Sequence, residues 1–411
     1  MTEDEKTRAA DGSKWAVARR SAVFGLSVWN EIDRLISRHP DVIYFGSGAP
    51  ASELYPLARM QEAAQAAWAN AGGALDYGEV EGYLPLRQLI ARRMGAQGIR
   101  VDPAHLMMTT GSQQGIDHVA KLMLDPGDLI VVEGPTYIGA MQAFDPYEPT
   151  YLAVPVDGEG LDVAELARAL DRAERAPKFI YTIPTFQNPT GFTMTLARRI
   201  ALTTLARARG ILLLEDDPYG EIHFGDPPPP ALRALDPDVI YLGTFSKTIA
   251  PGIRVGWLAA PADLIGMLLM VKEAADIHGD RMIMRTVHNI ADGFLDGHVA
   301  SARAIYRRRR DALLAGLDEH MPAGTVWSKP EGGFFVWLTL PPGLDSDEFL
   351  PFAAERGVAF LPGSYFYPKG WEVRTSLRLN FSTLSEERIA EGARRLGAAL
   401  LAFMEQKKLP T

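Results

Sequence analysis

The chain alternates short, fully apolar segments with longer segments of helical periodicity. The apolar segments cover residues 106–109, 129–132, 178–181, 211–214 and 239–243. Helical patterns lie between them, for example over residues 112–124 and 195–209. Strands that are covered on both faces are apolar along their whole length, whereas strands with one wet face alternate apolar and polar residues. The pattern therefore predicts an α/β fold with a mainly parallel central sheet and helices on both of its faces.

The pattern changes after about residue 285. Two long helices are predicted over residues 298–320 and 385–404, around amphipathic strands such as 334–338. A chain of 411 residues, of which 47% are hydrophobic, can fill one large core and a smaller one. We therefore predict a smaller α+β domain at the C-terminus. The predicted limits are a flexible N-terminal arm at 1–20, a segment joining the small domain at 21–47, a large domain at 48–285 and the small domain at 286–411.

Charge and cysteine content exclude several classes of protein. A net charge of −9 does not favour nucleic acid or an anionic membrane surface, and no apolar run reaches membrane-spanning length. The absence of cysteine excludes disulfides, thiolate metal sites and a cysteine nucleophile. The strongest basic run, residues 307–310, lies in a helical pattern and is predicted to be a solvated face with salt bridges. We expect a cytoplasmic protein without nucleic-acid or membrane partners.

The loop at residues 244–254 joins two segments that are predicted to be strands, and it contains Lys247 and Arg254. A lysine that attacks a carbonyl must lose its proton, and burial or a neighbouring cation lowers its pKa. Arg254 could supply that cation, and its planar guanidinium could also bind a phosphate. Taken singly, the two residues are equally compatible with a surface lysine and a salt-bridged arginine, so the other loops decide between the interpretations.

Ligands bind beyond the carboxyl ends of the strands in an open α/β sheet, and the residues expected there are chemically consistent. Gly111, Ser112 and Gln113 precede a predicted helix, whose first N–H groups could hold a phosphate. Tyr137 could cover a planar ring, and the amide of Asn188 could donate to a phenolate oxygen. A plain N-cap and an Asn-Pro turn are the alternatives for the first and the last of these features.

The acidic residue Asp216 follows a four-residue aliphatic run closely. A carboxylate in that place needs a cationic partner, and a pyridinium nitrogen is one. The charged ring would then be a stronger acceptor for the electrons left when Cα loses its proton. A metal site is not predicted, because no histidine or third acid lies at ligand spacing. Together the loops predict a site for pyridoxal phosphate.

These residues give the chain a resemblance to a known family. It resembles the class I/II aminotransferases of pyridoxal-phosphate fold type I, and within them the branch of kynurenine/2-aminoadipate and other broad-specificity aminotransferases. The resemblance extends from about residue 21 to the C-terminus. It rests on eight motifs in order: Tyr77, Gly111-Ser112-Gln113, Tyr137, Asn188-Pro189-Thr190-Gly191, Asp216-Asp217-Pro218-Tyr219, Ser246-Lys247, Arg254 and Leu377-Arg378-Leu379-Asn380-Phe381-Ser382.

The resemblance implies a role toward the cofactor for each matching residue. Lys247 would bind the cofactor's aldehyde covalently and, once released, carry a proton between Cα of the substrate and C4′ of the cofactor. Asp216 would bind the pyridinium nitrogen. The other contacts would come from Asn188 and Tyr219 at the phenolate oxygen, Tyr137 on the ring, and Ser112, Gln113, Ser246 and Arg254 at the phosphate.

The resemblance also implies how substrate and partner are held. Arg378 would clamp the α-carboxylate bidentately, a geometry that lysine offers poorly. Gly48 would lie beside that carboxylate, where a larger side chain would intrude, and Asn188 would face the substrate as well. Tyr77 would reach the cofactor phosphate and the substrate site of the neighbouring subunit. The family therefore implies a homodimer with shared active sites.

The implied reaction moves the amino group of an L-amino acid, aromatic, branched-chain or 2-aminoadipate-like, to a 2-oxo acid such as 2-oxoglutarate in a ping-pong cycle. Relatives specialised for 2-aminoadipate can carry an arginine in the N-terminal segment, whereas residues 27–32 read Ser-Val-Trp-Asn-Glu-Ile. An acidic side chain would then lack a charge partner. This difference favours aromatic or aliphatic substrates.

Two other functions stay open on the sequence. A β-elimination or a decarboxylation would use the same lysine and the same electron sink. Alternatively, the chain could be an effector-binding domain of a transcription regulator, but regulators of that kind append a basic winged-helix domain, and only about 20 polar residues precede the matching region. A dinucleotide fingerprint at residues 46–51 is rejected, because the residues that follow form a loop instead of a helix start.

Overall fold

The computed structural model describes residue 15, residues 17–23 and residues 28–409 of the chain, so most of the predicted N-terminal arm lies outside the described residues. Its central element is an eight-stranded sheet in the order β2-β9-β8-β7-β6-β3-β4-β5. Each of the five predicted apolar segments overlaps a strand of this sheet. The strands are β2 (Leu106–Thr109), β3 (Leu129–Gly134), β4 (Thr150–Asp157), β5 (Gly160–Leu161), β6 (Phe179–Thr182), β7 (Leu212–Asp216), β8 (Ile240–Thr244) and β9 (Gly256–Ala259).

The sheet is mainly parallel, as predicted. Strands β8, β7, β6, β3 and β4 are parallel to one another. Strand β9 is antiparallel to β8 and β2, and β5 is antiparallel to β4. Only residues 245–255 connect β8 with β9. This connection is too short for the helical crossover that a parallel pair requires, so the chain turns back. The turn keeps the whole loop at the carboxyl end of β8.

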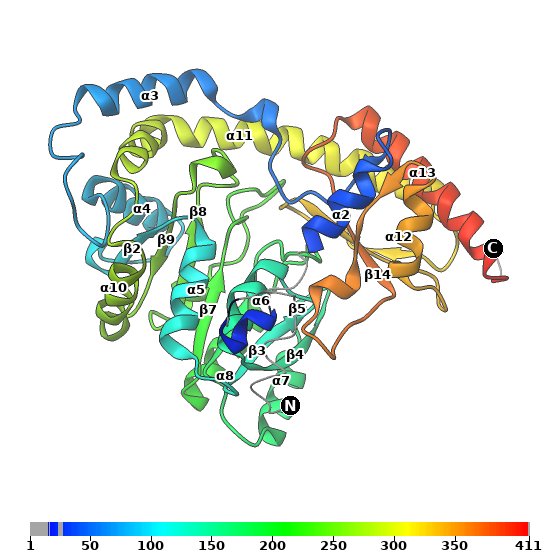
Figure 1. The fold of residues 1–411 in the computed structure, drawn as a ribbon, viewed down its shortest axis with the longest axis horizontal. Coiled ribbons are helices and arrows are strands. Elements are labelled where there is room, and N and C mark those ends of the chain that lie inside the picture. Colours follow the sequence, from blue (N-terminus) through cyan, green and yellow to red (C-terminus); the bar gives the residue numbers. More distant parts are fainter. Residues whose placement is uncertain (1–14, 16, 24–27, 410–411) are drawn as a thin grey trace.

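Helices cover both faces of the sheet, which confirms the prediction (Figure 1). Side chains of β6 alternate between the two cores, since Phe179 and Tyr181 pack on one side and Ile180 on the other. The first core is closed by α5 (Ser112–Met123), α6 (Ile138–Phe144) and α10 (Ala262–Asp276). The second core is closed by α7 (Val163–Arg172), α8 (Leu196–Arg209) and α9 (Leu232–Leu235).

The smaller part of the molecule is α+β, as predicted. Its sheet has the order β10-β11-β14-β13, with β10 (Val326–Trp327), β11 (Phe335–Thr339), β14 (Ser376–Asn380) and β13 (Leu361–Pro362). Strand β14 pairs antiparallel with both β11 and β13, which places Arg378 inside the sheet. A parallel pair of β1 (Ile43–Tyr44) and β12 (Val358–Ala359) attaches the N-terminal segment. The helices here are α2 (Val28–Ser37), α12 (Ser346–Ala354) and α13 (Glu386–Gln406).

One long helix, α11 (Arg281–His320), runs from the region of α10 to the region of α13 (Figure 1). Helix α3 (Leu57–Ala69) packs along it, and α4 (Leu84–Ala96) contacts it as well. The predicted helix over residues 298–320 is only the second part of α11. The first part was missed because Asp292 and Gly293 leave the helical conformation, with a φ of 73° at Gly293, and this break interrupts the apolar periodicity.

The arginine run at residues 307–310 matches its prediction as a solvated face with salt bridges only in part, since Arg308 pairs with Glu386 and Arg310 with Asp311. Arg307 and Arg308 are exposed, but the side chain of Arg309 is only 9% exposed. Its guanidinium donates to the carbonyl oxygen of Ser382 and pairs with Glu53. Arg309 therefore ties α11 to two distant loops, a role that a run of like charges does not reveal.

Candidate active site

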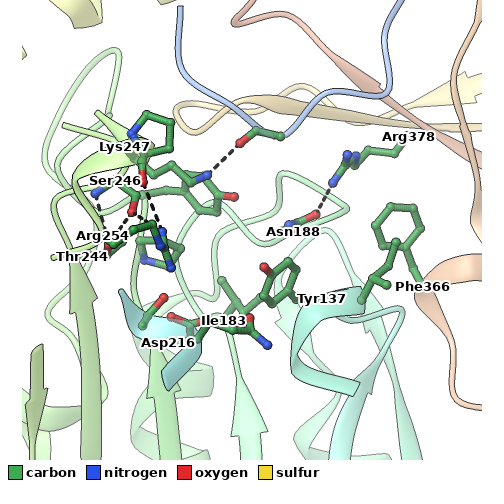
Figure 2. Close-up of a pocket in the computed structure, with 17 residues that line it drawn as sticks. Tyr137, Ile183, Asn188, Asp216, Thr244, Ser246, Lys247, Arg254, Phe366 and Arg378 are labelled. Carbon is green, nitrogen blue, oxygen red and sulfur yellow. Dashed lines mark hydrogen bonds between the residues drawn. The ribbon is translucent and has the colours of Figure 1, made fainter. Parts of the chain in front are cut away.

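A cavity of about 270 Å³ opens at the carboxyl ends of β3, β6, β7 and β8. In the view of Figure 2, Ser246, Lys247 and Arg254 lie on one side of it and Arg378 and Phe366 on the other. Except for Tyr77, every predicted site residue lines this cavity. These residues are Gly48, Ser112, Gln113, Tyr137, Asn188, Asp216, Tyr219, Ser246, Lys247, Arg254 and Arg378.

Lys247 lies three residues after the end of β8, in the loop that leads to β9. Its Nζ donates to the carbonyl oxygen of Gly48 at 2.7 Å. Burial lowers the pKa of Lys247 to about 8, and the positive charges of Arg378 and Arg254 act in the same direction. A substantial fraction of the amine is therefore neutral near neutral pH, which is the form that attacks a carbonyl.

The residues predicted for phosphate meet at one end of the cavity. Gly111 is the N-cap of α5, so the free N–H groups of that helix face the same region as Ser112 and Gln113. Arg254 adds a guanidinium there, and its Nη1 donates to Ser246 Oγ at 3.3 Å. Gly111 has a φ of 74°, and a Cβ on it would lie 2.3 Å from Arg254 Nη2. The cradle therefore requires glycine at this position.

Gly111→Ala is expected to weaken binding of pyridoxal phosphate. The substitution forces an L side chain into a left-handed conformation, at a cost of roughly 1–2 kcal/mol, and also displaces the Arg254 guanidinium. Gly98→Ala is the matched control, because Gly98 has a φ of 83° and an added Cβ there meets no atom within 4 Å. Equilibrium titration of the cofactor should show a loss of affinity for the first variant only. Equal affinities would contradict the cradle.

Asp216 ends β7 and is 2% exposed. Its Oδ2 accepts a hydrogen bond from the hydroxyl of Tyr181 at 2.8 Å, while its Oδ1 has no partner among the described residues. Burial raises the pKa of Asp216 to about 7, despite the hydrogen bond from Tyr181. A buried carboxylate with one free oxygen at a cavity wall suits a cationic ring nitrogen.

Aromatic and amide groups complete the cavity wall next to Asp216. Tyr137 is the N-cap residue of α6, and burial raises its pKa to about 12, so its hydroxyl stays protonated. Burial also raises the pKa of Tyr219. Asn188 lies in a turn with a cis Asn188-Pro189 bond, and its Oδ1 accepts from Arg378 Nη1 at 2.8 Å. The amide nitrogen and the two phenols offer hydrogen-bond donors to a ligand oxygen.

Arg378 is a buried cation without an acidic partner among the described residues. It is 2% exposed, its Cζ lies 4.2 Å from the ring centre of Phe335, and its Nε has no hydrogen-bond partner there. Nη2 donates to the carbonyl oxygen of Gly46 at 2.7 Å. Burial lowers the pKa of Arg378 to about 10, so it stays charged. Such a cation suits a ligand carboxylate.

Gly48 and Tyr77 occupy different surroundings. A Cβ on Gly48 would meet no protein atom within 4 Å, so the space beside this cavity-lining residue is open. Tyr77 lies outside the cavity with 83% of its surface exposed, and its ring stands edge-on to His278 with centroids 5.9 Å apart. Its contact with a neighbouring subunit stays a prediction.

Several cavity residues were not predicted. Thr244, Ile183 and Pro218 directly adjoin predicted strands or motifs, so the carboxyl-end rule could have included them. Phe366 comes from a short 3₁₀ helix, η6 (Gly363–Phe366), and no local pattern marks it. It packs in one apolar cluster with Trp337 and Ile138, and Phe366 and Ile138 line the cavity.

The donors around the cavity fit pyridoxal phosphate: a cradle for its phosphate, a free carboxylate oxygen for its ring nitrogen and a lysine for its aldehyde. The described residues contain no group of three histidine, aspartate or glutamate side chains placed to bind a metal ion. In the part of the chain that the structure describes, no helix combines the length and the apolar character needed to cross a membrane.

Comparisons with known proteins show the family of the chain. The model of the family "Aminotransferase class I and II" matches residues 40–396. The chain is 40% identical to aromatic-amino-acid aminotransferase 1 of Thermococcus litoralis, over 89% of each chain, and 40% identical to 2-aminoadipate transaminase of Thermus thermophilus, over 90% and 92%. A kynurenine aminotransferase of Pyrococcus horikoshii, solved with PMP, superposes with a TM-score of 0.90 at 37% identity, over 96% and 98%. The chain therefore belongs to the class I and II aminotransferases and is a pyridoxal-phosphate-dependent aminotransferase of fold type I.

Proposed function

We propose that this enzyme transfers the amino group of an L-amino acid with an aromatic or aliphatic side chain to a 2-oxo acid such as 2-oxoglutarate. One observation carries the proposal: a single cavity is lined by Lys247, by Asp216 and by Arg378. Among the described residues, Oδ1 of Asp216 has no hydrogen-bond partner and Arg378 has no acidic partner. When bound, pyridoxal phosphate supplies an aldehyde for the amino group and a cationic ring that withdraws electrons from the substrate's Cα. The same class of donor appears in the name of the Thermococcus litoralis relative.

Each residue has a separate task in this proposal. The neutral Nζ of Lys247 would hold the cofactor through its aldehyde, with loss of water, and once released the amine would hold the proton removed from the substrate's Cα. Arg378 holds the α-carboxylate, which orients the Cα–H bond for cleavage. Asp216 keeps the ring nitrogen protonated. The cofactor is held further by Asn188 and Tyr219 at its phenolate oxygen, Tyr137 on its ring, and Ser112, Gln113, Ser246 and Arg254 at its phosphate.

The cavity end for the substrate side chain is proposed to be apolar. Ile138 and Phe366 line it. The described cations at the cavity are Lys247, Arg254 and Arg378, and each has a task at the cofactor or the α-carboxylate. The segment at residues 27–32 is the one in which relatives specialised for 2-aminoadipate can carry an arginine. Ser27 and the side chains at residues 28, 29 and 31 lie outside the described residues.

A donor-by-acceptor panel tests this preference. We expect kcat/KM for aromatic and branched-chain donors to exceed the value for 2-aminoadipate by roughly tenfold or more, because a buried carboxylate without a cation is costly. Each donor is paired with 2-oxoglutarate and with pyruvate, which separates the donor preference from the acceptor preference. A best rate with 2-aminoadipate would contradict the apolar pocket while leaving transamination itself intact.

The active form is proposed to be a homodimer that works in the cytoplasm. Two exposed apolar side chains, Trp68 and Leu75, precede Tyr77 in the sequence. Two others lie within α10 and just after it, namely Met270 and Ile277. Burial of these side chains against a second copy would stabilise the assembly and would let Tyr77 reach the partner's cavity. Sedimentation analysis of the purified enzyme distinguishes a dimer from a monomer.

Arg378→Ala is expected to raise KM for both amino-acid and oxo-acid substrates. The lost contact is a charged, bidentate one, typically worth about 1.5–3 kcal/mol, so KM should rise by roughly 10- to 150-fold. Arg374→Ala is the control, because Arg374 is more than half exposed and pairs with Asp347. Steady-state kinetics with varied donor and acceptor measure both values. An unchanged KM would remove Arg378 from the substrate site.

A further inference from the structure

Tyr181 lies behind Asp216, on the strand next to it. In the sheet register Tyr181 of β6 faces Leu214 of β7, two residues before Asp216. The tyrosine is fully buried and does not line the cavity, but its hydroxyl donates to Asp216 Oδ2 at 2.8 Å. It therefore contacts the acid from outside the cavity lining.

The hydroxyl of Tyr181 can act only as a donor to Asp216. Burial and the neighbouring charge of Asp216 raise the pKa of Tyr181 far above its usual value, so the phenol keeps its proton. The ring is fixed as well, because Phe144 stands edge-on to it with centroids 5.6 Å apart. One oxygen of Asp216 is thus held from behind, and the other has no partner among the described residues.

We propose that Tyr181 is a positioning residue that holds Asp216 with Oδ1 toward the cavity and preserves its negative charge for the ring nitrogen of pyridoxal phosphate. This inference rests on the proposed role of Asp216. A buried carboxylate without a donor favours its neutral form, and a hydrogen bond to the charged form opposes that tendency. The bond also restricts rotation of the carboxylate, so that the free oxygen keeps one direction.

The neighbouring strand provides a matched control. Tyr241 of β8 is also buried, and its hydroxyl donates to Asp217 Oδ2 at 3.0 Å. Asp217 follows Asp216 directly but does not line the cavity. Tyr241→Phe therefore removes the same atom from an equivalent tyrosine–aspartate pair and leaves the hydrogen bond from Tyr181 to Asp216 in place.

The test compares binding of pyridoxal phosphate with binding of its deaza analogue, in which a C–H group replaces the ring nitrogen. The ratio of the two dissociation constants measures the interaction of Asp216 with that nitrogen. Tyr181→Phe should reduce the preference of the wild-type enzyme for pyridoxal phosphate by about tenfold and leave affinity for the analogue unchanged, because a hydrogen bond to a charged group is lost. Tyr241→Phe should keep the wild-type ratio. An unchanged ratio in Tyr181→Phe, or an equal reduction in Tyr241→Phe, overturns the proposal.

Tyr181→Phe alone leaves the carboxylate of Asp216 buried without its hydrogen-bond donor and could destabilise the protein. A double variant removes this problem. Tyr181→Phe combined with Asp216→Asn has no such charge, and it should show the same ratio as Asp216→Asn alone, since Tyr181 acts through the acid. A further reduction would overturn the proposal. A wild-type enzyme without any preference would instead refute the assignment of Asp216 to the ring nitrogen, so the two failures are distinguishable.

Discussion

Replacing Lys247 with alanine is expected to abolish transamination, with kcat/KM reduced by roughly 10³-fold or more. Lys247 is the only lysine among the described residues that line the cavity, so no described neighbour there can replace its amine. The variant loses both the nucleophile for the cofactor aldehyde and the base for the substrate's Cα proton. Steady-state assays with an aromatic donor and 2-oxoglutarate measure the loss. Full activity in this variant would refute the assignment of the nucleophile.

Two further measurements separate lost chemistry from lost structure. Lys178→Ala removes a lysine that is 41% exposed and pairs with Asp128, and it should keep wild-type activity. Borohydride treatment of the wild-type holoenzyme should attach the cofactor to a peptide that contains Lys247, and the alanine variant should yield no such peptide. The phosphate cradle is intact in Lys247→Ala, so thermal stabilisation by added cofactor should persist.

Local sequence patterns predicted the strands that are covered by helices on both faces. The runs that became β6 and β8 are apolar along their length because helices cover both faces, and this property is visible in sequence. The predicted starts of two helices, at residues 195 and 385, also agree with the structure. Thr195 and Ser385 are the N-cap residues there, and their side chains accept hydrogen bonds from the backbone N–H groups of Arg198 and Arg388. The start of α11 was missed, because the non-helical conformation of Asp292 and Gly293 interrupts the apolar periodicity of the helix.

From strand patterns alone, the candidate site could be predicted only where its residues follow strands, whereas Gly48 and Arg378 were predicted from the resemblance to the family. Asp216 and Lys247 come after apolar runs, and the carboxyl ends of neighbouring parallel strands meet at one edge of the sheet. Tyr181 and Phe366 were missed for a different reason. Tyr181 lies within a strand, and its partner Asp216 is 35 positions away, so only the register of β6 against β7 brings them together. Phe366 reaches the cavity from the small domain, and sequence patterns do not report such packing.

Asp216→Asn is expected to lower kcat by roughly 10²- to 10³-fold, the usual effect of removing one preorganised electrostatic contact at a reacting centre. The amide is nearly the same size but cannot carry the negative charge that keeps a ring nitrogen protonated. Electrons from the substrate's Cα would then be accepted less well. Asp217→Asn is the neighbouring control, because Asp217 accepts from Tyr241 and from the backbone N–H of Gly220 outside the cavity.

The pH dependence of cofactor binding adds a second measurement on the same variant. The pKa of Asp216 is raised to about 7, so its carboxyl becomes protonated as the pH falls through that value and can no longer pair with a cationic ring. Affinity of the wild-type enzyme for pyridoxal phosphate should therefore decline more steeply below about pH 7 than the affinity of Asp216→Asn. Because the negative charge of Asp216 opposes the lowering of the Lys247 pKa, the titration of Lys247 is followed separately in each protein. Parallel pH profiles, or a kcat in Asp216→Asn equal to that of the wild type, would show that the acid does not face the ring nitrogen.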